Sequence, residues 1–393
     1  MRIVDVASFF SAQSGGIKRY FREKARALPR HGFDCHFVVP GAEQGETGFG
    51  GGTLHTVAGA RVPFSPEYHF FRPDGALGEV LRRLQPDVVE VGSHYFLPSM
   101  VMRALDGLGV ARPPVVGFFH TDFPRQLVEP LANKYLPRAL AHRAVDGAWR
   151  FARRQFSRYD ATLVASRRIA GELEALGVPR VSWVGLGVDV ESFRPAPTTI
   201  VSAGSSPVVT YLGRFSPEKE LGLLMSTWDR VAQTTGARLR FIGNGPSRAT
   251  IEVFAHERSS VSVEPYLDSP AAVAGVLAAS DVVVLTSGTE TFSLATAEAL
   301  SCGTPVVGPA RGAVGEFLAE SGAGAAFAPG SAASLGDALV SVLARPARER
   351  RALGNLGREH ILRHFTWEKV AARLANVYQS VAAGRSVARA RAA

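Results

Sequence analysis

The sequence contains few cysteines and no hydrophobic stretch of membrane-spanning length. Only two of its 393 residues are cysteines, Cys35 and Cys302, and they lie far apart without paired spacing. This spacing excludes a disulfide framework and predicts two reduced, buried thiols. No apolar run reaches the roughly 20 residues of a transmembrane helix, and the start Met1-Arg-Ile-Val-Asp5 is too polar for a signal peptide. We therefore expect a cytoplasmic protein.

The sequence also lacks an Asp-x-Asp pair, a repeat of solenoid period and a heptad run. His360 and His364 are one helical turn apart, but no third ligand lies near them in the sequence. A structural zinc ion needs four ligands, so packing is the better interpretation of the two histidines. We expect neither a bound metal nor a cofactor.

Basic residues exceed acidic ones, with 44 Lys and Arg against 35 Asp and Glu, a net charge of +9 and a pI near 9.9. Such an excess favours an acidic partner: nucleic acid, an anionic membrane surface or a phosphorylated substrate. The excess is concentrated between Arg125 and Arg168, in a segment that we predict to be largely helical. The apolar positions expected to pack inward there are Leu140, Ala144, Trp149, Phe151 and Phe156.

Two interpretations of this basic segment are open. One is a solvated face that keeps the protein soluble. The other is docking on anionic lipid headgroups, where each basic residue near the surface adds about 1 kcal/mol.

Length and composition predict two α/β domains. A chain of 393 residues exceeds the size of a single hydrophobic core, and 46% hydrophobic with 20% charged residues is a globular composition. Short β-rich segments alternate with helical ones twice along the chain, which predicts two mostly parallel sheets covered by helices. The fold class is therefore α/β, with two Rossmann-like domains facing across a cleft. The strands are predicted at 2–8, 34–40, 87–91, 115–119, 161–165 and 181–184, then at 208–213, 238–242, 260–264, 281–285, 305–307 and 325–328.

The predicted domains are residues 1–195 and 207–365. The segment between them is rich in Pro, Ser, Thr and Gly and is expected to be an extended linker. An amphipathic helix at 366–383 follows and is a candidate to cross back to the N-terminal domain, while the basic tail 385–391 is expected to be disordered. In such folds a ligand binds in the crevice at the carboxyl ends of the strands.

Two carboxylates, Glu290 and Glu298, lie eight positions apart around the start of a predicted helix. If the helix begins near Phe292, its first N–H groups are free to bind an anion, and Glu298 faces the same cleft about one and a half turns later. One carboxylate can then accept hydrogen bonds from sugar hydroxyls and the other from a ribose. The alternative is a solvated Glu290 that complements the helix dipole and an unrelated, exposed Glu298.

Other candidate site residues follow predicted strands. Arg214 and Lys219 come directly after the strand 208–213, and two cations there suit a diphosphate. Gly243 begins the tight turn Gly243-Asn-Gly-Pro246 after the next strand.

The first half of the chain contributes a glycine pair and a histidine. Gly15 and Gly16 follow the first strand, where bare backbone N–H groups let a phosphate or sugar approach, although such a pair is more often only a turn. His120 follows the strand 115–119 and is expected to face across the gap, although a lone histidine there is more often structural.

Taken together, these segments resemble the donor half of glycosyltransferase family 4. The segments are Tyr211-Leu-Gly-Arg-Phe-Ser-Pro-Glu-Lys219, Phe241-Ile-Gly-Asn-Gly-Pro246 and Glu290 through Val307. The likeness covers nearly the whole chain and includes Gly15-Gly16 and the stretch from Val184 to Pro195. It implies a retaining enzyme of the GT-B architecture, with two facing Rossmann domains.

The resemblance also implies roles for individual residues. Arg214 and Lys219 would hold the donor diphosphate and stabilise the leaving nucleoside diphosphate. Glu290 would bind donor sugar hydroxyls, and Glu298 would bind the ribose. The backbone N–H groups of Phe292, Ser293 and Leu294 would contact phosphate or sugar, with Gly15, Gly16 and Gly243 also at the donor. His120 would hydrogen-bond a hydroxyl of the transferred sugar. Ser293 is a departure, because the family often has Gly after the Phe.

The expected chemistry is metal-independent, since the metal clamp of another glycosyltransferase class would need an Asp-x-Asp pair. Arg214, Lys219 and the helix N-terminus would then stabilise the leaving-group charge. The resemblance implies front-face attack with retention, in which the departing phosphate takes the acceptor proton.

The expected function is transfer of a hexose from a UDP- or GDP-linked sugar to an acceptor glycan or lipid. His120-Thr-Asp-Phe-Pro124 and the basic segment are similar to members that glycosylate lipids. A membrane lipid or lipid-linked glycan is thus the candidate acceptor, and the inner face of the cell membrane is the candidate peripheral location. No nucleic acid is expected as a partner. Two alternatives stay open: a sugar-nucleotide epimerase of the same architecture, and a non-catalytic basic protein that binds membrane or nucleic acid.

Overall fold

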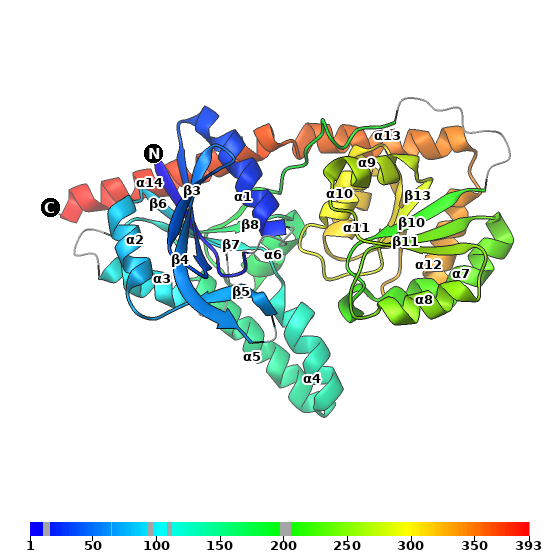
Figure 1. The fold of residues 1–393 in the computed structure, drawn as a ribbon, viewed down its shortest axis with the longest axis horizontal. Coiled ribbons are helices and arrows are strands. Elements are labelled where there is room, and N and C mark those ends of the chain that lie inside the picture. Colours follow the sequence, from blue (N-terminus) through cyan, green and yellow to red (C-terminus); the bar gives the residue numbers. More distant parts are fainter. Residues whose placement is uncertain (11–15, 64, 93–96, 108–111, 197–205, 393) are drawn as a thin grey trace. The chain divides into compact units, whose positions relative to one another are not determined.

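The computed structural model contains two α/β units, and it describes residues 1–10, 16–63, 65–92, 97–107, 112–196 and 206–392 (Figure 1). The first unit comprises Met1–Gly187 and Trp367–Ala393, and the second comprises Val188–Thr366. Each unit has its own sheet and its own buried apolar core. Both sheets are mostly parallel, so the predicted α/β class is confirmed.

The first unit is built on a nine-stranded sheet with the order β3-β4-β2-β1-β6-β7-β8-β9, in which β5 also pairs with β4. All pairs are parallel except those of β3 and β5 with β4. The strands are β1 (Arg2–Val6), β2 (Asp34–Gly41), β3 (Gly45–Phe49), β4 (Gly52–Val62), β5 (Ser65–Phe71), β6 (Val88–Val91), β7 (Val115–Phe119), β8 (Ala161–Val164) and β9 (Val181–Trp183).

Strands β3, β4 and β5 were not predicted. β3 is almost wholly exposed and contains two glycines in five residues, so it lacks the apolar alternation by which a strand is recognised. Its place in the sheet comes from pairing with β4, which is a long-range interaction.

The helices of the first unit include one at the end of the chain. They are α1 (Gly16–Ala27), α2 (Ala76–Leu84), α3 (Leu97–Asp106), α4 (Glu129–Tyr135), α5 (Arg138–Phe156), α6 (Arg167–Ala175) and α14 (Trp367–Ala392), with a 3-10 turn η1 (Leu28–His31) and a π-helical turn η2 (Pro124–Val128). The tail 385–391 was predicted to be disordered, but α14 continues through it. Alanine and arginine are strong helix formers, and they make up most of this tail.

The second unit has a six-stranded, wholly parallel sheet with the order β12-β11-β10-β13-β14-β15. Its strands are β10 (Val208–Leu212), β11 (Arg238–Ile242), β12 (Val261–Glu264), β13 (Val282–Val284), β14 (Val306–Pro309) and β15 (Gly324–Phe327). All six lie within two residues of the predicted ranges. They are recognisable because most are short β-branched runs bounded by turn residues.

Helices connect these strands: α7 (Leu221–Thr235), α8 (Arg248–His256), α9 (Pro270–Ala279), α10 (Leu294–Ser301), α11 (Gly312–Ser321), α12 (Ala332–Leu343) and α13 (Ala347–His364). The chain order of the strands reverses between β10 and β13, which are neighbours in the sheet. Ligands of doubly wound sheets bind at the carboxyl ends of the strands at such a reversal. The loops after β10 and β13 are therefore the expected place of a site.

No helix in the described ranges is both long and apolar enough to cross a membrane. Cys35 and Cys302 are free and buried, as predicted, and burial raises the pKa of each thiol to about 12. Both thiols stay protonated and unreactive near neutral pH.

A buried charge cluster joins the first and last parts of the first unit. Lys24 on α1 donates to Asp5 on β1 over 2.6 Å and lies 3.1 Å from Glu90 on β6. Glu90 accepts further hydrogen bonds from the hydroxyls of Tyr20 (3.0 Å) and Tyr378, the latter on α14. All five side chains are buried. Tyr378 thus ties α14 to the centre of the sheet.

The two carboxylates of this cluster differ in proton affinity. Burial raises the pKa of Asp5 well above its usual value, although the charge of Lys24 opposes this. Burial alone would also raise the pKa of Glu90, but Lys24 and the hydrogen bonds from Asp5 and Tyr378 lower it. Asp5 therefore holds a proton more readily than Glu90, which stays ionised against Lys24.

We predict that Lys24→Met destabilises the first unit by about 3–5 kcal/mol, because it leaves the buried, ionised Glu90 without its cation. Tyr378→Phe removes one donor to Glu90 and is expected to cost about 1–3 kcal/mol. Denaturant unfolding measures both changes, and Tyr135→Phe at an exposed tyrosine is the matched control. Wild-type stability of Lys24→Met would contradict this account.

Candidate functional site

The loop that carries Arg214 is fixed by the loop after the neighbouring strand. Phe215 donates its backbone N–H to the carbonyl of Asn244 over 2.8 Å. Gly243 has a φ of 150°, and a Cβ at this position would collide with the carbonyl oxygen of Gly213. Only glycine allows this close approach. Arg214 itself is exposed, and no carboxylate of the described residues lies within ion-pair distance of its guanidinium.

Lys219 and Glu290 form an ion pair between the loops that follow β10 and β13. The Lys219 ammonium donates to Oε1 of Glu290. The hydroxyl of Thr286 donates to the carbonyl of Lys219, and the Glu290 carbonyl accepts the N–H of Ala313 over 3.2 Å. The two side chains are still 25% and 22% exposed, so both remain accessible to a ligand. The structure thus brings Lys219, the predicted phosphate-binding cation, close to Glu290, the predicted sugar-binding carboxylate. The two meet where the order of the strands reverses between β10 and β13.

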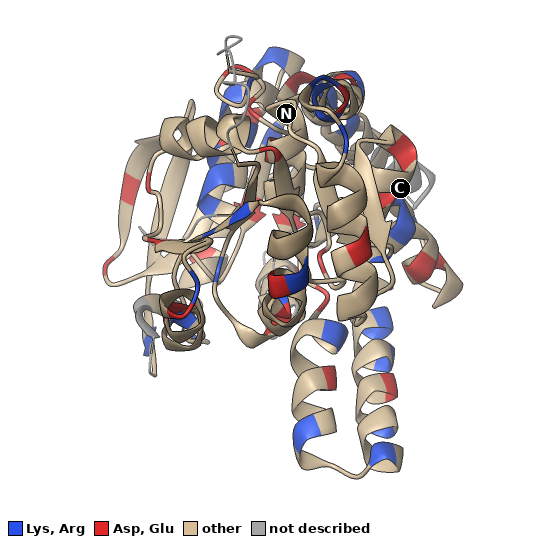
Figure 2. Cartoon of the chain, turned by 90° about the vertical axis from the view of Figure 1, so that its right-hand side faces the viewer, with Lys and Arg blue, Asp and Glu red and all other residues tan. Residues whose placement is uncertain are grey.

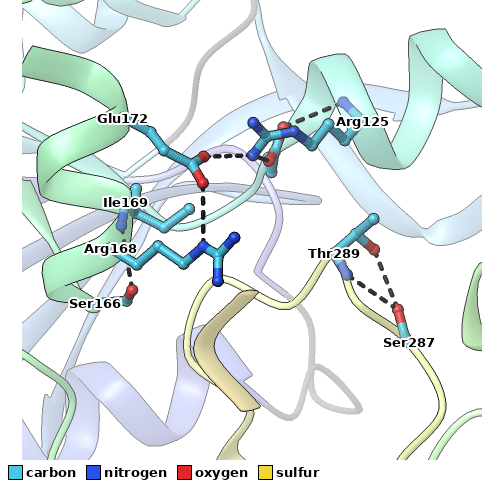
Figure 3. Close-up of polar contacts among 8 residues, drawn as sticks. Arg125, Ser166, Arg168, Ile169, Glu172, Ser287 and Thr289 are labelled. Atoms are coloured by element: carbon cyan, nitrogen blue, oxygen red, sulfur yellow. Dashed lines mark hydrogen bonds and ion pairs between the residues drawn. The ribbon is translucent and has the colours of Figure 1, made fainter. Parts of the chain in front are cut away.

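The segment leading to Glu290 is ordered by two hydroxyls that the sequence analysis did not single out. The hydroxyls of Ser287 and Thr289 lie 3.1 Å apart, as Figure 3 shows. The backbone N–H of Thr289 also donates to the Ser287 hydroxyl over 3.5 Å, and a spacing of two residues in a Ser/Thr-rich loop is a signal of such local side-chain to backbone bonding.

Helix α10 begins at Leu294, slightly later than the predicted start near Phe292. Phe292 is buried instead, with its ring edge-on to Phe317 at 5.3 Å and Phe365 at 5.5 Å. Ser293 precedes the helix, and its hydroxyl bonds to that of Thr296 over 2.8 Å rather than to a backbone N–H. No side chain of the described residues caps this helix, so its first N–H groups are available to an anion.

The left-handed conformation of Ser293 explains why glycine suits this position. Ser293 has a φ of 63°, which is sterically costly for residues with a Cβ and free of cost for glycine. Ser293 therefore adopts, at a steric cost, a backbone turn that glycine would adopt without one. Its hydroxyl bond to Thr296 helps to maintain that turn.

Glu298 lies inside α10 and is only 5% exposed. Its charge, together with burial, contributes to the raised pKa of Cys302. A carboxylate this buried is not a solvated surface residue. Neither Glu290 nor Glu298 fits the alternative of two unrelated exposed acids. The contact of Glu298 with a ribose stays a prediction.

In the first unit, His120 follows β7 and is held by aromatic rings. Its imidazole stacks on Phe118 with the ring centroids 3.8 Å apart and packs against the edge of Tyr20 at 5.2 Å. Burial lowers the pKa of His120 to about 4, so the ring is neutral near pH 7. Gly16 is the first residue of α1, and Gly15 lies outside the described residues.

Arginines at both ends of the predicted basic segment form ion pairs with carboxylates. Arg125 bonds to Asp122 (2.9 Å) and Glu172 (2.6 Å) and lies over the ring of Trp149, as Figure 3 shows for the Glu172 contact. Arg168 reaches the other oxygen of Glu172 at 3.4 Å. Arg125 thus joins η2 to α6, and Glu172 partly neutralises both arginines.

Two apolar positions of that segment were wrongly predicted to pack inward. Leu140 is 47% exposed and Phe151 is 42% exposed. They lie on α5, one of two neighbouring helices that extend from the sheet of the first unit. Helical spacing could not show that Leu140 and Phe151 are left exposed by the described residues around α5.

Two family models match the chain in succession. Residues 14–192 match "Glycosyltransferase Family 4", and residues 206–345 match "Glycosyl transferases group 1". The chain belongs to glycosyltransferase family 4. Gly16 and His120 lie in the first match, and all the predicted site residues from Arg214 to Glu298 lie in the second.

Similar proteins of known activity are full-length matches. The chain is 28% identical over 387 residues to the GDP-mannose-dependent alpha-(1-6)-phosphatidylinositol dimannoside mannosyltransferase of Mycobacterium tuberculosis, covering 95% of this chain and 94% of the relative. It is also 28% identical over 403 residues to a GDP-mannose-dependent alpha-mannosyltransferase of Mycolicibacterium smegmatis, covering 98% and 99%.

Among solved structures, sucrose-phosphate synthase from Thermosynechococcus elongatus superposes with a TM-score of 0.77 at 18% identity, covering 98% of this chain and 100% of that one. The predicted GT-B fold class is thereby confirmed. The protein is a glycosyltransferase, and the comparisons support transfer over the epimerase and the non-catalytic binding protein.

We predict that Glu290→Ala and Glu290→Gln lower kcat/KM for sugar transfer by about 10²–10³-fold, because Ala removes the oriented acceptor for the sugar and Gln replaces the charged carboxylate by a neutral amide with one acceptor oxygen. A radiolabelled-donor transfer assay measures this. Asp337→Asn, which breaks an exposed ion pair with Arg230 in the same unit, is the control and should keep full activity. Unchanged turnover of Glu290→Ala would remove the assignment of this residue.

Proposed function

We propose that this glycosyltransferase transfers mannose, with retention and without a metal ion, from GDP-mannose to a phosphatidylinositol-based glycolipid. The observation that carries the proposal is the Lys219–Glu290 ion pair at the strand reversal, beside the uncapped α10. GDP-mannose is the donor printed in the names of both mycobacterial relatives, and the phosphatidylinositol-based acceptor class is taken from the name of the first alone.

In the proposed reaction, the bond between C1 of mannose and the β-phosphate oxygen breaks, and its electrons stay on the phosphate. Arg214 offers a fork of donors, Lys219 a point charge and α10 its free N–H groups to the negative charge that develops. An ammonium has three donors, so Lys219 can keep its bond to Glu290 while it binds a phosphate oxygen.

The acceptor hydroxyl attacks C1 on the face from which GDP departs, and the departing phosphate oxygen takes its proton. Glu290 accepts hydrogen bonds from mannose hydroxyls, and Glu298 from the ribose. His120, neutral near pH 7, hydrogen-bonds another hydroxyl of the transferred sugar. The backbone N–H groups of Phe292, Ser293 and Leu294 bind phosphate or sugar in this proposal, and Gly15, Gly16 and Gly243 are assigned to donor binding.

We place the enzyme at the inner face of the cell membrane, as a peripheral protein in contact with anionic lipid. The net charge of +9 supports this location, since anionic leaflets attract basic proteins. An acceptor that is itself a lipid requires the enzyme to work at that surface.

The nucleotide preference is testable by thermal stabilisation. A ligand that binds only the folded state stabilises it by about 2.7 kcal/mol at 100 times its Kd, so at equal concentration the nucleotide with the lowest Kd gives the largest rise in Tm. We expect this nucleotide to be GDP rather than UDP or ADP. Lys219→Met should reduce the GDP shift, whereas Arg230→Met, at an exposed ion pair of the same unit, should not. A larger shift with UDP would contradict GDP-mannose as the donor.

A further inference from the structure

Exposed apolar side chains gather on one part of the first unit. Thirteen large hydrophobic residues are exposed among those described, and six of them lie between residues 127 and 151. This stretch contains α4 and α5, which lie side by side as a helical hairpin and extend away from the sheet (Figures 1 and 2). A concentration of this kind marks an interaction surface rather than the scattered exposure of an ordinary protein face.

The apolar residues are densest where α4 turns into α5. We call residues 131–140 the hairpin tip; every residue from 133 to 140 is exposed. Its large apolar side chains are Leu131 (49% exposed), Tyr135 (69%), Leu136 (42%) and Leu140 (47%).

Basic residues surround the same side chains. From Glu129 to Phe156 the hairpin has six Lys and Arg against two acidic residues. Lys134 lies over the ring of Tyr135 at 5.0 Å, and Arg138 and Arg143 are exposed at the start of α5. Figure 2 shows basic residues along both helices. Unlike Arg125, these three form no ion pair with a carboxylate of the described residues.

We propose that the hairpin tip inserts into the headgroup region of an anionic membrane, with its leucines and Tyr135 in the acyl boundary and Lys134, Arg138 and Arg143 on lipid phosphates. Amphipathic helices with leucine and aromatic side chains beside basic ones bind at this depth. Tyrosine is suited to it because its ring is apolar and its hydroxyl stays hydrated.

The charge of the hairpin favours an anionic membrane, rather than a second copy of this chain, as the partner that binds the hairpin tip. Two such hairpins would bring six basic residues against six, and charged residues are depleted in the cores of protein interfaces. An anionic leaflet instead attracts each basic residue. The inference deepens the proposed location at the membrane and names the part of the chain that makes the contact.

The test measures binding of the full-length protein to vesicles of phosphatidylcholine with or without phosphatidylinositol. The triple variant Leu131→Ser, Leu136→Ser, Leu140→Ser should bind anionic vesicles at least tenfold more weakly, and the weakening should persist in high salt. The variant Lys134→Gln, Arg138→Gln, Arg143→Gln should lose about fivefold per charge at low salt only. The matched control is Val253→Ser, Leu356→Ser, Leu362→Ser, three exposed apolar residues of the second unit, and should bind as wild type.

Insertion is measured directly with an environment-sensitive fluorophore at a single introduced cysteine, because both native cysteines are buried. A label on Leu136→Cys should shift to the blue and brighten with anionic vesicles, while one on Val253→Cys should not change. Wild-type vesicle binding by the triple leucine variant, or an unchanged spectrum at Leu136→Cys, would overturn the proposal. Conversion of a wild-type dimer to a monomer by the triple leucine variant, with vesicle binding intact, would assign the tip to a second copy instead.

Turnover of a water-soluble acceptor separates this inference from the proposed function. The triple leucine variant should transfer mannose to a short-chain acceptor within twofold of wild type. Loss of vesicle binding with that activity retained supports the tip as a docking element. Vesicle binding by a wild type that shows no mannosyl transfer would refute the proposed function and leave the docking proposal standing.

Discussion

The reversal of strand order between β10 and β13 is the constraint on which the donor site depends. Because these strands are neighbours and parallel, the loops at their carboxyl ends start side by side, although they lie about 70 residues apart in the sequence. The loop after β10 presents Arg214 and Lys219, and the loop after β13 presents Glu290. The Lys219–Glu290 ion pair is the direct result of this topology.

Charge has different uses in the two units. In the first unit, Lys24, Asp5 and Glu90 are wholly buried and fixed by Tyr20 and Tyr378, so they are committed to structure. In the second unit, the Lys219–Glu290 pair keeps part of its surface exposed. It lies before a helix whose first N–H groups are capped by no side chain in the described part of the chain. A charged side chain can bind a ligand only where part of its surface is exposed, so that the ligand can reach it.

Much of the second unit could be predicted from the sequence, because strands such as β10, β13 and β14 are short β-branched runs between turn residues. The family resemblance and the candidate site residues after these strands could also be predicted, because each depends on a short, continuous segment of the sequence. Strand β3 could not be predicted, since its position comes from pairing with β4 rather than from its own polar residues. The start of α10 was displaced because Phe292 is buried against Phe317 and Phe365, a packing interaction that spacing does not show.

The sequence also contains a signal of the buried charge cluster. Asp5 and Glu90 interrupt otherwise apolar, buried strands, and a charged residue in such a strand must find a buried partner. The sequence could not show that Lys24 is the partner of these two carboxylates, because Lys24 reaches them from a helix. Likewise, the exposure of Leu140 depends on α5 extending beyond the sheet, which no property of its own sequence reveals.

The most direct test of the central claim is calorimetric binding of GDP and of GDP-mannose to wild type, Lys219→Met and Glu290→Gln. If Lys219 binds phosphate and Glu290 binds the sugar, Lys219→Met weakens both ligands to a similar degree, whereas Glu290→Gln weakens GDP-mannose and leaves GDP nearly unchanged. Equal weakening of both ligands by Glu290→Gln, or unaltered binding in both variants, would contradict the account.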